Sequence, residues 1–123
     1  MTGRARWRVL VADDSQSVRE ALCQLIADDP DLELVGEAAD AETAIDLART
    51  IRPDVVVLDG RMPGGGGAAA LAALGAELPE VRVVVLSAYD DAQSRIELAG
   101  ADRFVSKGER VDLIDVIREV VST

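Results

Sequence analysis

Five short runs of β-branched and other apolar residues divide the sequence, and the stretches between them are polar or show helical periodicity. The runs span Arg8–Ala12, Leu32–Ala38, Val55–Leu58, Val81–Ser87 and Arg103–Lys107. The third run begins with four consecutive apolar residues, which is typical of a central strand buried on both faces of a sheet. Strands that alternate with helices predict a parallel sheet between two layers of helices, joined by right-handed crossovers. The expected fold class is therefore α/β, doubly wound, with five strand–helix units, (βα)5.

Apolar residues spaced three and four positions apart predict the first two helices. The first follows Ser15 or Ser17, since either serine can cap it, and ends at Asp29-Pro30. Asp40 is the expected cap of the second. The predicted buried positions are Val18, Ala21, Leu22, Leu25 and Ile26 in the first helix, and Ala41, Ala44, Ile45 and Ala48 in the second.

Glycines separate the third strand from the third predicted helix. Met62-Pro63 and the four residues Gly64–Gly67 predict a flexible loop. The helix is expected from Ala68 to about Glu77, with Leu71 and Leu74 as its apolar anchors. A short fourth helix, Ala92–Ala99, is closed by a glycine. The last helix carries an apolar stripe made of Leu113, Ile114, Ile117, Val120 and Val121.

Length and composition suit one domain. The chain has 123 residues, 49% of them hydrophobic, which is enough to bury a core. We expect a basic tail over residues 1–6, one domain over residues 7–121, and the start of a linker at 122–123. Cys23 is the only cysteine, so no internal disulfide can form, and its helical context favours a small core residue. The absence of histidine excludes histidine-based catalysis and His-rich zinc sites.

The charge balance is strongly acidic, with 13 basic and 23 acidic side chains and a net charge of −10. Direct nucleic-acid binding normally needs a basic face, so this balance disfavours it and is compatible with a metal ion or a basic partner. The sequence shows no signal peptide and no apolar run long enough to span a bilayer. We therefore expect a cytoplasmic location and no membrane partner.

Polar side chains gather at the carboxyl ends of the predicted strands. Asp13-Asp14 follows the first strand, Asp59 the third, while Ser87 ends the fourth and Lys107 the fifth. The second strand ends in Glu37-Ala38-Ala39, which indicates no particular chemistry. In open parallel sheets the functional crevice lies beyond these ends. Each residue alone is more typical of a cap, a turn or a solvated surface, but together they form a chemically coherent set.

Three carboxylates at one sheet edge repel one another, so they raise each other's pKa values or require a cation. A hard divalent ion such as Mg²⁺, or Mn²⁺, suits them, whereas zinc is disfavoured without nearby His or Cys. A carboxylate beside such an ion and an ammonium group can attack phosphorus, with the metal and Lys107 stabilising the phosphoryl oxygens. We therefore predict that Asp59 is a nucleophile and that the product is an aspartyl phosphate.

Four segments resemble the receiver domain of two-component response regulators: VLVADDSQSVREAL, RPDVVVLDGRMPG, VVVLSAYD and GADRFVSK. The similarity extends from about Arg8 to Val121, and LVGEAADAETAI and DGRMPG are most similar to the NarL/FixJ-type subfamily. The resemblance implies a flavodoxin-like fold with a five-stranded parallel sheet in the order 2-1-3-4-5. It also implies a phosphoacceptor signalling domain, not a conventional enzyme, that assists its own phosphorylation and dephosphorylation.

The resemblance further implies the partners and the metal ligands. Asp59 would take a phosphoryl group from a phosphohistidine on a sensor histidine kinase. Asp14, Asp59 and the backbone carbonyl of Arg61 would bind Mg²⁺, and Asp13 would act through a metal-bound water. A homodimer would form through the first and last helices, or through the fourth helix, fifth strand and last helix. DNA would be bound only through an output domain outside this chain, in a longer transcription regulator.

The switch residues follow from the same resemblance. Ser87 and Lys107 would contact the phosphoryl group, and Phe104 would turn inward when Ser87 is recruited. Judged without the resemblance, Phe104 is equally typical of a strand core. Tyr89 could gate access to Asp59, although an exposed loop aromatic is the favoured interpretation. The sequence departs from the family in a shortened segment between Ser87 and the fifth strand, and in Gly108 after Lys107, where many receivers have proline.

Three alternatives stay open. The first is a receiver-like interaction module that works without phosphorylation, which the shortened fourth helix favours slightly. The second is a haloacid-dehalogenase-type phosphatase, which would need a D-x-D pattern after the first strand, where this chain has Asp13-Asp14-Ser15. The third is a flavin-binding flavodoxin-like protein, but no hydroxyl-rich phosphate loop follows the first strand.

Overall fold

The structure is a computed structural model that describes residues 6–62, 66–87, 100–106 and 113–122. Its sheet contains five parallel strands: β1 (Trp7–Ala12), β2 (Leu32–Ala38), β3 (Val55–Asp59), β4 (Arg82–Ser87) and β5 (Arg103–Ser106). The strand order is β2-β1-β3-β4-β5, which confirms the predicted fold class and order. The strand β3 is buried at every position, as its unbroken apolar run predicts.

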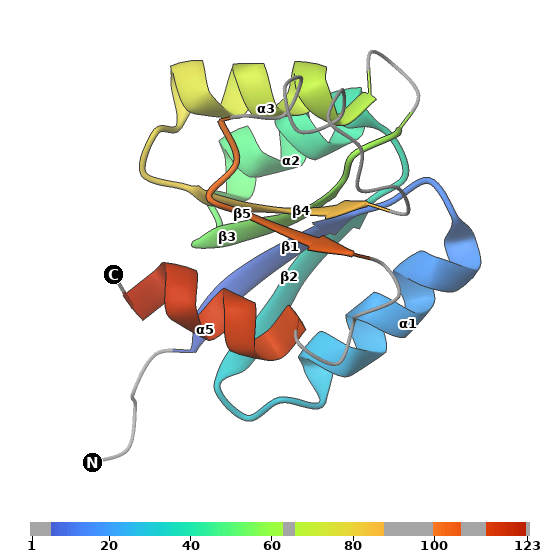
Figure 1. The fold of residues 1–123 in the computed structure, drawn as a ribbon, viewed down its shortest axis with the longest axis vertical. Coiled ribbons are helices and arrows are strands. Elements are labelled where there is room, and N and C mark those ends of the chain that lie inside the picture. The colour runs from blue at the N-terminus through green and yellow to red at the C-terminus, as the bar shows by residue number, and fades with distance from the viewer. Residues whose placement is uncertain (1–5, 63–65, 88–99, 107–112, 123) are drawn as a thin grey trace.

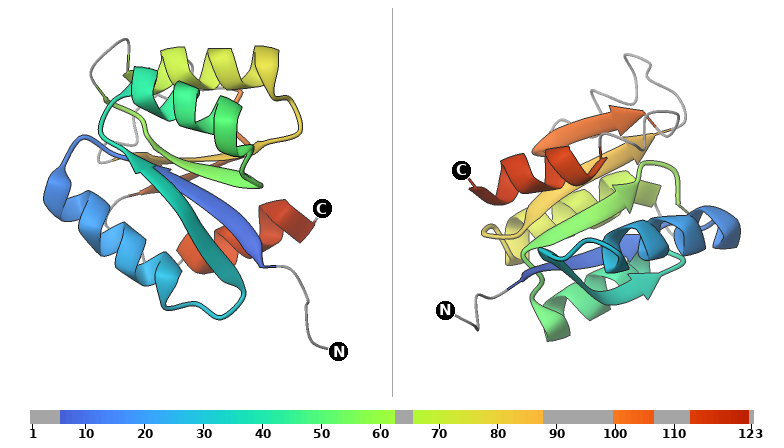
Figure 2. Two further views of the ribbon diagram at one scale, coloured as in Figure 1. Left: turned by 180° about the vertical axis from the view of Figure 1, so that it is seen from behind. Right: turned by 90° about the horizontal axis from the view of Figure 1, so that it is seen from below.

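Helices cover both faces of the sheet (Figure 1). They are α1 (Gln16–Ala27), α2 (Ala41–Ile51), α3 (Gly66–Glu77) and α5 (Leu113–Ser122). The helices α2 and α3 pack on one face, and α1 and α5 pack on the other, as the views from behind and below also show (Figure 2). The predicted fourth helix, 92–99, lies outside the described residues.

The two sheet faces form two apolar cores. Alternate residues of one strand point into different cores: Leu10 lies with α2 and α3, whereas Val9 and Val11 lie with α1 and α5. Their side chains are fully buried. One sheet thus serves as the wall between both cores, which ties the positions of the strand ends to the packing on either side.

Capping residues fix where the first two helices begin. The Ser15 hydroxyl accepts a hydrogen bond from the Val18 amide at 3.4 Å, so Ser15, and not Ser17, is the cap of α1. The Asp40 carboxylate accepts one from the Thr43 amide at 2.7 Å and caps α2 as predicted. This hydrogen bond lowers the pKa of Asp40 because it favours the charged form.

Several predicted boundaries were wrong by one or two residues. The strand β1 begins at Trp7, β4 begins at Arg82, and β3 includes Asp59. The helix α3 begins at Gly66 and not at Ala68, so two of the four glycines predicted as loop lie in its first turn. One predicted core position was also wrong, since Ala21 is exposed.

Most predicted apolar positions are confirmed. Leu71 and Leu74 anchor α3 in the core, and Leu113, Ile117 and Val120 are buried on α5. Cys23 is buried in the core beside α5, as expected for a small core residue. Within the described ranges, no helix has both the length and the apolar character needed to cross a membrane.

Candidate functional site

The sheet register brings the first and third strand ends together. Ala12 of β1 lies opposite Leu58 of β3, so the next residues, Asp13 and Asp59, emerge side by side at the carboxyl edge. The backbone ladder continues past this point, because the Asp13 amide donates to the Ala38 carbonyl at 3.0 Å. The Asp13 backbone is therefore held by β2, and Asp59 is held within the sheet opposite Leu86 of β4.

Three carboxylates converge at this edge. One carboxylate oxygen from each of Asp13, Asp14 and Asp59 lies within 4.8 Å of the other two. Asp13 is fully buried, Asp59 is 4% exposed, and Asp14 faces solvent. Among the residues that the structure describes, these are the only acidic or sulfur-bearing side chains grouped closely enough to hold a metal ion. The predicted acidic site is thus assembled, with two buried groups and one open to solvent.

Backbone amides orient two of these carboxylates. The Ser15 amide donates to Asp13 Oδ1 at 2.9 Å, and the Arg61 amide donates to Asp59 Oδ1 at 3.1 Å. Each of these hydrogen bonds restricts the orientation of the carboxylate that accepts it. An all-oxygen set of this type fits a hard divalent ion such as Mg²⁺, and it lacks the nitrogen or sulfur ligands typical of zinc.

Gly66 and Gly67 allow a close backbone approach at the start of α3, so the predicted flexible connector is wrong for these two glycines, while Gly64 and Gly65 lie outside the described residues. A Cβ atom at Gly67 would lie 2.7 Å from the Asp59 carbonyl oxygen and 2.9 Å from Gly60 Cα. Gly66 has a φ of 69°, in the left-handed region that favours glycine. The first turn of α3 therefore packs directly against the backbone that carries Asp59.

An arginine that sequence reasoning missed also reaches this region. Arg19 of α1 donates from Nη1 to the Asp13 carbonyl at 2.8 Å and from Nε to Glu37 Oε1 at 2.9 Å. Its side chain is only 16% exposed. The end of β2, in which the sequence indicated no chemistry, thus carries the ion-pair partner of Arg19. The available signal was a basic residue on the first turns of the helix that follows Asp13-Asp14.

Cys23 lies one helical turn after Arg19 and contacts the same glutamate. Burial, with a smaller contribution from the neighbouring Glu37 carboxylate, raises the pKa of the Cys23 thiol from 9.0 to about 11. The thiol is therefore neutral at physiological pH. This confirms a packing role and argues against a reactive thiolate.

The remaining predicted site residues are only partly described. Ser87 is the last residue of β4 and lies opposite Ser106 of β5 in the register. Phe104 of β5 is half-buried and packs against the core shared by α2 and α3. Lys107, Tyr89 and Gly108 lie outside the described residues. The register does place the backbone of Ser87 at the same sheet edge as the acidic group.

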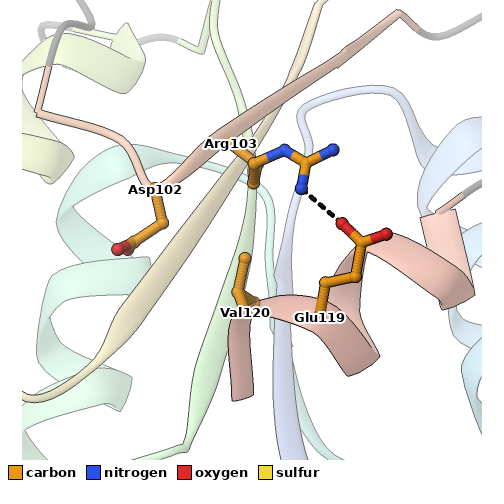
Figure 3. Close-up of a pocket in the computed structure, with 4 residues that line it drawn as sticks. All are labelled: Asp102, Arg103, Glu119 and Val120. Atoms are coloured by element: carbon orange, nitrogen blue, oxygen red, sulfur yellow. Dashed lines mark hydrogen bonds and ion pairs between the residues drawn. The ribbon is translucent and has the colours of Figure 1, made fainter. Parts of the chain in front are cut away.

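A pocket at the other end of the sheet has different chemistry. It has a volume of about 390 Å³ and is lined by Asp102, Arg103, Glu119 and Val120, at the start of β5 and on α5 (Figure 3). Arg103 and Glu119 pair with each other across it. The charged side chains of this pocket are occupied by Arg103 pairing with Glu119 and by Asp102 accepting from the Val83 amide, so the acidic group at the carboxyl ends is the stronger candidate site.

Comparison with known proteins gives a consistent picture. The family model of the response regulator receiver domain matches residues 9–118. The response regulator GacA of Pseudomonas aeruginosa is 37% identical over 116 residues, which cover 92% of this chain and 54% of that protein. The DNA-binding transcriptional activator DevR/DosR of Mycobacterium tuberculosis is 35% identical over the same shares. The chain spans about half the length of these curated relatives.

A solved structure supports the same assignment. The receiver domain of the putative response regulator NarL from Mycobacterium tuberculosis superimposes with a TM-score of 0.92 at 30% identity. The match covers 97% of this chain and 98% of that structure. The likeness therefore extends over the whole fold and not over a shared core alone.

Proposed function

This protein belongs to the response regulator receiver domain family, and from that premise we propose that Asp59 is its phosphoacceptor. The observation that carries the proposal is the meeting of three carboxylates within 4.8 Å, with Asp59 at the end of a fully buried central strand. A nucleophile on such a strand is held still before the reaction, which lowers the entropic part of the barrier.

The proposed reaction transfers a phosphoryl group from a phosphohistidine of a sensor kinase. A carboxylate oxygen of Asp59 attacks phosphorus as the P–N bond breaks, and an acyl phosphate forms on Asp59. The imidazole nitrogen keeps the electron pair of the broken bond and takes up a proton. The Arg61 amide donates to Asp59 Oδ1 at 3.1 Å and helps to orient the attacking carboxylate.

The acidic group also supports the proposal of a bound divalent metal ion. Asp14, Asp59 and the Arg61 carbonyl would hold Mg²⁺ or Mn²⁺ directly, and Asp13 would hold it through a water molecule. The bound ion would neutralise charge on the phosphoryl oxygens. Asp13 is buried and fixed by the Ser15 amide, which suits an indirect role, whereas the exposed Asp14 is open to direct coordination. Lys107 and Ser87 would contact the phosphoryl oxygens.

The output would be a change of surface. A phosphoryl group adds nearly two negative charges at Asp59, and Ser87 would move toward the new oxygens. Phe104 would then turn inward and change the surface around β5 and α5. Kinase docking, a homodimer through α1 and α5 or through the β5–α5 side, and control of transcription by an attached output domain follow from this proposal. A cytoplasmic location stays a prediction on the same basis.

Intact mass spectrometry tests the proposal. The protein is incubated with acetyl phosphate and Mg²⁺, beside Asp59→Ala and a sample with EDTA. We expect a phosphoryl-sized mass gain in the wild type alone. A folded protein that gains no mass would favour the phosphorylation-independent interaction module instead.

A further inference from the structure

The side chain of Arg19 binds the backbone of the loop that carries Asp13 and Asp14. Arg19 donates to the Asp13 carbonyl and to Glu37, so its guanidinium joins α1, the end of β1 and the end of β2. The two bonds use different nitrogens of one planar group, which limits its orientation. Because only 16% of its side chain is exposed, Arg19 has less conformational freedom than an arginine on the open surface.

The position of this contact matters because it acts on the backbone between two acidic side chains. The Asp13 carbonyl belongs to the peptide group that links Asp13 to Asp14, so fixing it restricts the direction of both carboxylates. On the other side of Asp13, the backbone amide is already tied to Ala38. The backbone amide of Asp13 is thus fixed by β2, and its backbone carbonyl is fixed by Arg19.

We propose that Arg19 is a positioning residue for the metal site, and that the Arg19–Glu37 pair sets the affinity of the acidic group for Mg²⁺. The inference rests on the proposed function, because it takes Asp13, Asp14 and Asp59 as the metal-holding group. Residues that orient metal ligands without touching the metal typically change affinity by roughly 10- to 100-fold when they are lost. Arg19 acts through a backbone carbonyl, so we expect an effect near the lower limit.

Electrostatics alone predicts the opposite sign. Arg19 is a cation near a site that binds a cation, and its removal would leave the charge of Glu37 unbalanced. This loss of one positive charge makes the surroundings more negative and would strengthen Mg²⁺ binding. Screening at physiological ionic strength would hold this gain to about two-fold. The direction of the change in affinity therefore separates positioning from simple charge.

Arg49 and Glu77 offer a matched control. They form an ion pair between α2 and α3, with Nε to Oε1 at 2.7 Å and Nη2 to Oε2 at 2.8 Å. This pair holds two elements together as the Arg19 pair does, but it touches neither the Asp13 loop nor the acidic group. Arg49→Gln removes the same charge and the same kind of bond away from the site.

The experiment titrates the ¹⁵N-labelled protein with Mg²⁺ and follows the backbone amide resonances of Ser15 and Gly60 by NMR. Arg19→Gln and Arg19→Lys are compared with Arg49→Gln and the wild type, and the dispersion of each spectrum checks folding. We expect the dissociation constant to rise about ten-fold in Arg19→Gln and to stay raised in Arg19→Lys, since lysine keeps the charge but not the planar fork. Arg49→Gln should bind as the wild type does.

Two results would contradict these expectations, and each would exclude a different part of the proposal. If the wild type binds Mg²⁺ and Arg19→Gln binds it equally or more tightly, the positioning role is wrong while the proposed function stands. If the wild type binds no Mg²⁺ at this edge, the proposed metal site is wrong and the role of Arg19 falls with it. Should Arg19→Gln fail to fold, Arg19→Lys alone decides, because full wild-type affinity in that variant would exclude a geometric role.

Discussion

At the scale of single residues, the pKa of Cys23 shows how burial changes the ionisation of a side chain near the acidic site. Its thiol lies beside Glu37 with a pKa raised to about 11, from 9.0, mainly by burial. The folded protein therefore favours the neutral thiol. This contribution to stability is complete below about pH 9 and is lost as the pH rises through about 11, because the unfolded thiol ionises first.

The free energy of unfolding should thus fall more steeply between about pH 9 and about pH 11 in the wild type than in Cys23→Ala. Urea titrations followed by the fluorescence of Trp7, the only tryptophan, measure both proteins at each pH. Cys23→Ala also removes buried volume, but that cost is the same at every pH. If both proteins lost stability equally as the pH rises, the pKa of the Cys23 thiol would not be raised by folding.

At the scale of elements, the start of α3 rests on the backbone that carries Asp59. A methyl group at Gly67 would meet the Asp59 carbonyl at 2.7 Å and the Gly60 carbonyl at 3.0 Å, and neither backbone atom can rotate away. Gly75, in the same helix, is exposed and has no atom within 4 Å of the added carbon. The two glycines therefore serve different purposes within one element.

Gly67→Ala should destabilise the protein by about 1–3 kcal/mol through this overlap. Gly75→Ala should stabilise it by about 0.5–1 kcal/mol, because alanine loses less backbone entropy in a helix. Urea unfolding of both variants and the wild type gives the comparison. Equal stability of Gly67→Ala and the wild type would mean that α3 does not pack against β3 as closely as described.

The same helix shows where sequence reasoning succeeds and fails. Periodicity and apolar anchors such as Leu71 and Leu74 predict an element well, because burial of a stripe is a property of the segment itself. The start at Gly66 was missed because a glycine run is a poor helix former in isolation, and here a tertiary contact overrides that preference. The Arg19–Glu37 pair was missed for a related reason, since residues 18 positions apart meet only through the fold.

At the scale of the whole molecule, the fold and the acidic site follow almost directly from the order of apolar runs and strand-end residues. Parallel strands end at one edge, and the order 2-1-3-4-5 that the family resemblance implies makes the first and third strands neighbours, so Asp13 and Asp59 meet there. The proposed signal must then cross the sheet from β3 to β5. Phe104 is half-buried on β5 and packs against the core of α2 and α3, where a change of rotamer would alter both packing and surface.

Phe104 is the only phenylalanine in the chain, so 4-fluorophenylalanine labels it alone. We expect its ¹⁹F resonance to shift when acetyl phosphate and Mg²⁺ are added, because the ring moves to a more buried setting. In Ser87→Ala the mass gain should persist while the resonance stays in place. A full shift in Ser87→Ala would contradict coupling through the Ser87 hydroxyl.

The measurement that tests the central claim most directly locates the phosphoryl group on the chain. Borohydride reduces an aspartyl phosphate to homoserine, and tandem mass spectrometry of the digested protein identifies the converted residue. The account predicts homoserine at Asp59 alone, only after treatment with acetyl phosphate and Mg²⁺. Homoserine at Asp13 or Asp14, or a phosphoryl mass gain with no converted aspartate, would contradict it.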